Sequence, residues 1–275
     1  MRQRNQQEER KDSVHQIKNK RMIKVSHEVP LSMLEMSREF NDYDYALVHL
    51  FEEHSEYLAF FIESLRLGRE VILDNSIFEL GTAFDMKEFA GWVERLKPTT
   101  HIIPDVLGSA TGTLDNLEKW FKDHPNMPGK SMGVVQGSTY ETLKACYMAM
   151  VDQVDEIALC FHYPYYEQND EGRMNGRIDL ITKFMEEGVI REDKSHHLLG
   201  CSLPQEFEYY KGASFIKSLD TSNPIVHGIK EIPYTSFGLD AKESIKLADL
   251  IGHIPTMEQM NIIKHNVQMF KDLLK

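Results

Sequence analysis

The sequence predicts an α/β protein folded as a (β/α)8 barrel of the TIM type. Short apolar or β-branched runs alternate with amphipathic segments at intervals of about 25–35 residues. Runs that are apolar throughout, and not at every second position, are typical of a parallel sheet whose faces are covered by helices. Seven such units within a chain of 275 residues favour a closed barrel over an open sheet. No glycine-rich dinucleotide loop follows the first predicted strand, which removes the commonest open-sheet alternative.

Seven of the eight strands are predicted from the apolar runs. They cover residues 45–51, 70–76, 100–106, 131–137, 156–162, 196–202 and 215–222. The eighth strand is expected to be irregular and has two candidate positions, 225–234 and 247–253. Both candidates follow the seventh run, so closure of the barrel is assigned to the C-terminal part of the chain.

The amphipathic segments predict helices with apolar positions at helical spacing. They cover residues 86–96, 113–124, 140–154, 178–188, 204–212, 241–251 and 256–275. The polar, aromatic and glycine-bearing stretch 163–177 follows the fifth predicted strand. It is interpreted as a long loop of the kind that holds substrate contacts. Its tyrosines, Tyr163, Tyr165 and Tyr166, fit either stacking on a base or packing of the loop on the barrel.

Composition limits the classes of function. No run approaches the roughly 20 apolar residues that a membrane span requires, and the first residues lack the apolar core of a secretory signal. Only three cysteines occur (Cys146, Cys160 and Cys201), and they are far apart in the sequence. A disulfide framework and a cysteine-rich zinc site are therefore not expected. We expect a cytoplasmic protein without membrane contact, bound metal or cofactor.

Charge is unevenly distributed along the chain. The total is −12, but residues 1–24 hold eight Lys or Arg against three Asp or Glu, an excess of +5 that leaves −17 for residues 25–275. We expect residues 1–24 to form a basic, flexible segment and residues 25–275 to form one catalytic barrel domain. The basic segment fits a solvated tail or an arm that attracts phosphate.

Polar residues cluster where the predicted strands end. Asp74, Asp105 and Asp220 each follow an apolar run. The carboxyl ends of the strands of a barrel meet at one mouth, so these side chains are expected to share a cavity. Neighbouring carboxylates in a partly dry pocket separate one another's pKa values, which suits one as a nucleophile and another as a proton donor. The alternative for each is an N-cap of the following helix.

Several of these strand ends carry a resemblance to a known family. The clearest motifs are GVVQG at 133–137, HHLLG at 196–200 and LDTSNP at 219–224. Weaker matches are LDNS at 73–76 and the His265-Asn266 pair of the last predicted helix. In this order and spacing they resemble the tRNA-guanine transglycosylase family over about residues 70–275.

The resemblance implies a role for each matching position. Asp220 would be the nucleophile that attacks the anomeric carbon of a nucleoside, and Asp74 would assist proton movement. The implied base-binding residues are Asp105, Gln136, Gly137, Cys160 and Phe161. Possible further substrate contacts are Asn75, Ser76, Gly200, Ser222 and His227. A carboxylate is a suitable nucleophile for an oxocarbenium-like centre, and acceptors beside an amide suit a guanine-like edge.

The departures from the family concern the polymer that is modified. The CxCxxC zinc motif of the family is absent, the chain is shorter than its bacterial members, and residues 223–226 replace an arginine-bearing loop. A compact, zinc-free form resembles the branch that places 7-deazaguanines into DNA, as in some bacteriophages. The expected activity is therefore exchange of guanine in a polynucleotide, with DNA favoured, for a free 7-deazaguanine base. If the protein is phage-encoded, it would act in the cytoplasm of a bacterial host.

Three alternatives remain open from the sequence. The first is guanine exchange in tRNA, and the second is hydrolysis of the N-glycosidic bond of free nucleosides by the same carboxylates. The third is an inactive subunit that binds a base or a nucleic acid. His196 and His197 are expected to pack or to cap a strand and not to bind a metal, because no HxH or HxxxH pattern occurs.

Overall fold

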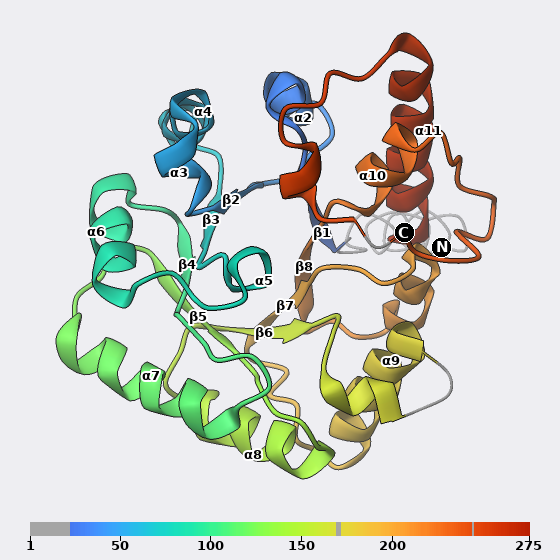
Figure 1. Ribbon diagram of the computed structural model, residues 1–275. Coiled ribbons are helices and arrows are strands. Elements are labelled where there is room, and N and C mark those ends of the chain that lie inside the picture. The colour runs from blue at the N-terminus through green and yellow to red at the C-terminus, as the bar shows by residue number, and fades with distance from the viewer. Residues whose placement is uncertain (1–22, 169–171, 244) are drawn as a thin grey trace, which may run out of the picture.

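The protein is a (β/α)8 barrel of the TIM type, as the sequence predicts. The computed structural model describes residues 23–168, 172–243 and 245–275. Eight parallel strands form one sheet in the order β1-β8-β7-β6-β5-β4-β3-β2, which curves into a nearly closed barrel (Figure 1). The strands are β1 (Lys24–His27), β2 (Asp44–Leu47), β3 (Val71–Asp74), β4 (Thr100–Ile102), β5 (Lys130–Val134), β6 (Glu156–Cys160), β7 (Ser195–Leu199) and β8 (Ile216–Thr221).

The strand that completes the barrel comes from the N-terminal end of the described chain. β1 pairs in parallel with β8, and the backbone N–H of Asp42 donates to the carbonyl of Val25 at 2.9 Å beside β2. The expectation of an eighth strand at 225–234 or 247–253 is wrong. Both segments contain short helical elements instead, α10 (Asn223–Ile229) and η4 (Leu247–Leu250). β1 escapes a search for apolar runs because it is only four residues long and Val25 is its one apolar side chain.

Helices surround the strands on the outside of the barrel, as α6 to α9 show in Figure 1. The longer ones are α4 (Ser55–Arg66), α6 (Met86–Leu96), α7 (Ala110–Asp123), α8 (Tyr140–Met150), α9 (Gly172–Glu186) and α11 (Met257–Leu273). The short ones are η1 (Leu31–Met33), α2 (Leu34–Ser37), α3 (Leu50–Glu53), α5 (Ile77–Leu80), η2 (Pro164–Gln168), η3 (Pro204–Tyr210) and the two named above. Each long helix turns its apolar side toward the sheet.

Local chemistry sets where several helices begin. The carboxylate of Asp85 accepts from the backbone N–H groups of Lys87 and Glu88 at 3.0 Å and starts α6. Thr139 and Thr256 each form a reciprocal capping box at the start of α8 and α11. Such caps satisfy amide groups that the first turn of a helix leaves unpaired. Helix starts are therefore among the features that the sequence encodes locally.

Two predicted segments differ from the structure. The described part of the predicted helix 241–251, residues 241–243 and 245–251, is irregular except for the 3-10 turn η4. The predicted loop 163–177 is largely helical, since it contains η2 and the first residues of α9. Tyr163 and Tyr166 are fully buried, and the hydroxyl of Tyr163 donates to the carbonyl of Val135 at 2.6 Å. These two tyrosines pack the segment onto the barrel.

Two further expectations concern the N-terminal segment and membrane spans. The predicted basic segment lies outside the described residues except for its last two positions, 23 and 24. Within the part of the chain that the structure describes, no helix is both long enough and apolar enough to span a bilayer.

Candidate active site

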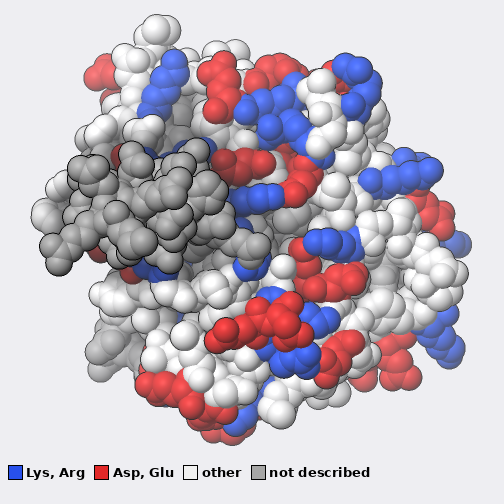
Figure 2. Space-filling view, turned by 180° about the vertical axis from the view of Figure 1, so that it is seen from behind, with Lys and Arg blue, Asp and Glu red and all other residues white. Residues whose placement is uncertain are grey.

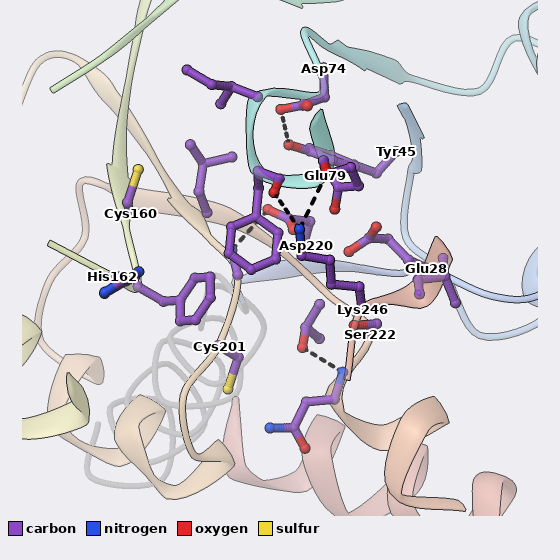
Figure 3. Close-up of a pocket in the computed structure, with 18 of the residues that line it drawn as sticks. Glu28, Tyr45, Asp74, Glu79, Cys160, His162, Cys201, Asp220, Ser222 and Lys246 are labelled. Carbon is purple, nitrogen blue, oxygen red and sulfur yellow. Dashed lines mark hydrogen bonds between the residues drawn. The ribbon is translucent and has the colours of Figure 1, made fainter. Parts of the chain in front are cut away.

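One large cavity opens at the carboxyl ends of the strands. Its volume is about 540 Å³, within the range of small-molecule sites. Residues from all eight strands or the loops that follow them line it, together with α5 and a strap formed by residues 239–243 and 245–251 (Figure 3). Seven residues proposed from the sequence lie on its wall: Asp74, Asp105, Cys160, Phe161, Gly200, Asp220 and Ser222. The barrel mouth therefore gathers residues that are up to 148 positions apart in the sequence.

Asp220 lies near the end of β8 and is only 5 % exposed. Its Oδ1 atom is 3.0 Å from Nε2 of His197 and accepts from the backbone N–H of Gly200 at 3.2 Å. Both partners come from the neighbouring strand β7 and the residue after it. Two hydrogen bonds to one oxygen fix the orientation of the carboxylate and leave Oδ2 without a partner among the described residues.

His197 is held on both ring nitrogens. Nδ1 is 2.8 Å from Oγ of Ser218, and the ring stacks on Tyr45 with centroids 5.9 Å apart and planes 10° apart. His196 points to the opposite side of β7, because side chains alternate along a strand, and it contacts the hydroxyl of Tyr147 at 2.9 Å. Both histidines pack within the barrel, and His197 also orients Asp220.

Asp74 ends β3 and accepts two short hydrogen bonds. The hydroxyl of Tyr45 donates to Oδ2 at 2.7 Å, and the backbone N–H of Ser76 donates to Oδ1 at 2.5 Å. Burial raises the pKa of Asp74 to about 7 in spite of these two donors, and the nearby charge of Asp220 acts in the same direction. Asp74 therefore holds or releases a proton near neutral pH.

Asp105 forms the centre of a buried amide network. Its Oδ1 accepts from Nδ2 of Asn75 at 2.9 Å, and its Oδ2 accepts from Nε2 of Gln136 at 2.6 Å. Burial raises the pKa of Asp105, while the two amide donors oppose that shift. Oε1 of Gln136 in turn accepts from the backbone N–H of Gly108 at 3.0 Å. Gln136 thus supports Asp105 from behind and is not part of the cavity wall.

The remaining predicted positions also lie behind the wall. Asn75 and Ser76 are fully buried beneath the cavity. Gly137 packs so closely on the start of α8 that a Cβ atom there would lie 2.7 Å from Oγ1 of Thr142. His227 belongs to α10, where Nδ1 contacts the carbonyl of Asn223 at 2.8 Å. These residues shape the site without facing its interior.

Three carboxylates of the cavity are not predicted from the sequence. Glu28 follows β1, Glu79 lies on α5, and Glu243 lies on the strap. Figure 3 shows Glu28 and Glu79 directed toward Asp220. Burial raises the pKa of Glu79 to about 8, and the charge of Asp74 adds to the effect. The pKa of Glu28 lies well above its usual value, from burial and then from repulsion by Asp220. Glu28 carries no sequence signal because β1 has no apolar run, and Glu79 carries none because α5 is only four residues long.

The strap covers one side of the mouth. Nζ of Lys246 donates to the carbonyls of Phe78 and Glu79 on α5 at 3.2 and 3.3 Å (Figure 3). Nζ of Lys242 lies 4.0 Å from the centroid of the Phe161 ring. The strap therefore joins the ends of β3 and β6 across the cavity. An amphipathic pattern made residues 241–251 look helical, but their apolar side chains pack on the barrel mouth instead.

A buried ion pair supports the β6 and β7 ends. The guanidinium of Arg177 binds the carboxylate of Glu206 through Nε at 2.6 Å and Nη2 at 2.9 Å, and both side chains are fully buried. Arg177 also donates to the carbonyls of Leu199 at 3.1 Å and Gly200 at 3.0 Å. Because the backbone N–H of Gly200 donates to Asp220, Arg177 is linked to the proposed nucleophile through the backbone of Leu199 and Gly200.

Comparison with known protein families and curated proteins identified no relative of this chain. No family model matches the chain, and no protein in the curated collection matches it. Among residues 23–168, 172–243 and 245–275, no group of three or more His, Cys, Asp or Glu side chains is placed to hold a metal ion. The three cysteines are free thiols.

Proposed function

We propose that this protein is a transglycosylase that exchanges guanine in a polynucleotide for a 7-deazaguanine base through a covalent aspartyl-glycosyl intermediate. The observation that carries the proposal is the arrangement of Asp220. This carboxylate is oriented by His197 and Gly200 and has a free oxygen inside a cavity of base-plus-sugar size. A carboxylate so held is suited to attack at an anomeric carbon.

The first half-reaction forms the bond between Asp220 and the sugar. The free oxygen of Asp220 attacks C1′, the C1′–N9 bond breaks, and guanine leaves with the bonding electron pair. The departing base takes up a proton, for which Asp74 is the donor because its pKa of about 7 keeps part of it protonated at neutral pH. Asp74 is an anion after this step.

The second half-reaction reverses the first with another base. Asp74 removes the N9 proton of the incoming 7-deazaguanine, N9 attacks C1′, and the bond between the sugar and Asp220 breaks. The carboxylate of Asp220 and the acid form of Asp74 are thereby restored. The two half-reactions together require no cofactor and no net redox change.

Base selection is assigned to Asp105. Its carboxylate accepts from neighbouring amides and faces the cavity, so it can accept from the ring N–H and the amino group of a guanine-like base. Asn75 and Gln136 hold it from behind. An adenine-like base would present an acceptor to this carboxylate, which leaves a buried group unpaired.

DNA is favoured over tRNA as the polymer because the sequence lacks the family's zinc motif and arginine-bearing loop. Exchange in tRNA remains the alternative with the same chemistry. Hydrolysis of free nucleosides is a second candidate function. It is favoured by the strap, which narrows the mouth through the Lys246 contacts and so suits a small substrate. The inactive binding subunit is the remaining alternative.

The deciding experiment offers the full chain duplex DNA, single-stranded DNA, tRNA and free deoxyguanosine, each with an isotopically labelled 7-deazaguanine. Mass spectrometry of the digested nucleosides measures where the label enters. Label in DNA supports the proposal, and label in tRNA alone replaces DNA by tRNA. Free guanine released from nucleosides without label uptake supports the hydrolase. No change in any substrate, with retained binding of the base, supports the inactive subunit.

A further inference from the structure

The cavity contains a cation that lacks an acceptor. Nζ of Lys242 contacts the face of Phe161 but forms no hydrogen bond or ion pair with any residue of the described part of the chain. Desolvation by the surrounding side chains lowers the pKa of Lys242, and the positive charges of Arg173 and Arg177 add to this shift. Lys242 is nevertheless exposed where it lines the cavity, so its ammonium group is accessible to an anionic ligand.

Two hydroxyl groups line the same cavity as this lysine. The Phe161 ring beneath Lys242 packs on Gly200, where a Cβ atom would lie 2.4 Å from Cδ1 of the ring. Ser202 follows two residues later, and its carbonyl accepts from Nδ2 of Asn223, the neighbour of Ser222. Both serines line the cavity, and among the described residues neither hydroxyl takes part in a hydrogen bond. They are donors available to a ligand.

The place of this group in the barrel is informative. Ser202 follows β7 and Ser222 follows β8. In TIM-type barrels the loops after the last two strands frequently hold a phosphate group of the ligand. Arg173, which lines the same cavity, donates to Glu167 at 3.5 Å and adds positive potential. An ammonium with two hydroxyl donors is a usual set of partners for phosphate.

We propose that Lys242, Ser202 and Ser222 form a phosphate-binding subsite of the cavity, so that the ligand is a nucleotide unit and not a bare nucleoside. The inference rests on the proposed function for the position of the sugar, which would lie between this subsite and Asp220. The phosphate is either the terminal group of a mononucleotide or a backbone group of a polynucleotide. On the face shown in Figure 2, Lys and Arg side chains lie among Asp and Glu side chains and form no broad basic surface. Phosphate binding is therefore assigned to the cavity and not to that face.

Among the described residues six carboxylates line the cavity, and two of them repel an anion less than an ordinary carboxylate does. Asp74 and Glu79 have pKa values of about 7 and 8. They are therefore partly or mostly protonated at neutral pH, which reduces their repulsion of a phosphate. The carboxylates of Asp105 and Asp220 then suit the base and sugar of a nucleotide, and Lys242 suits its phosphate.

Calorimetry with the full chain tests the subsite without any turnover. The probes are deoxyguanosine, deoxyguanosine 5′-monophosphate and the dinucleoside phosphate of deoxyguanosine and thymidine. The wild-type protein is expected to bind the monophosphate at least about tenfold more tightly than deoxyguanosine, which is the usual size of a charge-assisted contact. Lys242→Gln should remove most of this difference, and Lys242→Arg should retain it. Lys264→Gln, an exposed lysine of α11, is the matched control and should change nothing.

The outcomes separate the subsite from the proposed reaction. Equal affinity of the wild-type protein for nucleoside and nucleotides overturns the subsite, even where base exchange is observed. An equal loss of all three affinities in Lys242→Gln also overturns it, because the lysine would then only hold the strap. A phosphate preference that depends on Lys242, in a protein that exchanges no base, keeps the subsite and rejects the transglycosylase. Preference for the monophosphate alone identifies a terminal phosphate, and preference for both nucleotides identifies a backbone phosphate.

Discussion

Nε2 of His197 lies 3.0 Å from Oδ1 of Asp220, and Nδ1 of the same ring is 2.8 Å from Oγ of Ser218. The imidazole thus links one strand of the barrel to the next and holds the carboxylate in a single orientation. One carboxylate oxygen remains directed into the cavity. This relationship gives Asp220 its proposed role as the nucleophile.

Replacing Asp220 by Asn should abolish base exchange and leave the fold intact. The amide keeps the shape of the side chain but is a poor nucleophile, so the expected loss is at least about 3 kcal/mol of barrier, a hundredfold or more in rate. Isotope incorporation into the polymer measures the rate, and thermal unfolding checks the fold. Near-normal turnover of the Asn variant would remove Asp220 from the mechanism.

Asp105→Ala should weaken binding of a guanine-like base more than Gln136→Ala does. Asp105 faces the cavity as a charged acceptor, whereas Gln136 acts through its 2.6 Å hydrogen bond to Asp105. Calorimetry with 7-deazaguanine and 7-deazaadenine gives the preference between the two edges. Both variants should lose preference for guanine, with the larger loss in Asp105→Ala. Equal affinity of the wild-type protein for the two bases contradicts the assignment.

The stability of Asp74→Asn relative to the wild-type protein should be greater at pH 8 than at pH 5. The pKa of Asp74 is about 7 in the folded protein against 3.8 in the unfolded chain. Between these values the folded state keeps a proton that the unfolded state has released, so wild-type stability falls as the pH rises through this window. The neutral amide removes this loss, which between pH 5 and pH 8 is at most about 3 kcal/mol because only the two units from pH 5 to the pKa of about 7 contribute. Denaturant unfolding at both pH values measures it.

The control for this effect is the exposed Asp115→Asn on α7. Its change in unfolding free energy should be the same at pH 5 and pH 8. A stability difference between wild type and Asp74→Asn that is likewise independent of pH would show that Asp74 ionises normally in the folded protein.

Breaking the Arg177–Glu206 pair should strongly destabilise the fold. Arg177→Met leaves a fully buried carboxylate without its partner, for which about 3–5 kcal/mol is expected. The double variant Arg177→Met with Glu206→Leu removes both charges and should recover much of that loss. Denaturant unfolding of the single and double variants completes the cycle. A double variant as unstable as the sum of its singles would mean that the two groups act independently.

The recovered double variant also tests how Asp220 is positioned. It lacks the guanidinium that binds the carbonyl of Gly200, whose N–H binds Asp220. We expect the free energy of unfolding of this double variant to approach the wild-type value more closely than its exchange rate does. Its affinity for the free base should change little. Full recovery of the rate would limit Arg177 to a structural role.

Deleting residues 1–20 should weaken binding to DNA of every sequence alike. The segment carries much of the local excess of positive charge. Binding of the intact chain should therefore depend more steeply on salt, with a log–log slope of roughly 0.9 per phosphate neutralised on duplex DNA. Affinity for the free base should not change. An unaltered salt slope after the deletion would assign phosphate contacts to the barrel alone.

The sequence by itself determined the architecture and the positions of the main carboxylates. Apolar runs that alternate with amphipathic segments encode strands and helices through neighbouring residues, so seven of the strands could be located. In a parallel barrel every strand end lies at the same mouth. Asp74, Asp105 and Asp220 could therefore be placed around one cavity before any contact between them was known.

The tertiary structure alone decided how the barrel closes and which side chains face its interior. β1 is a strand because residues 24–27 meet residues 216–221, a pairing across nearly the whole chain that no local pattern encodes. The same closure brings Glu28 to the cavity, and the folding of the strap brings Lys242. Asp105 and Gln136 both lie just beyond a strand, yet only Asp105 faces the cavity. The direction of a side chain beyond a strand end depends on the loop backbone and on its partners, which are fixed only by long-range packing.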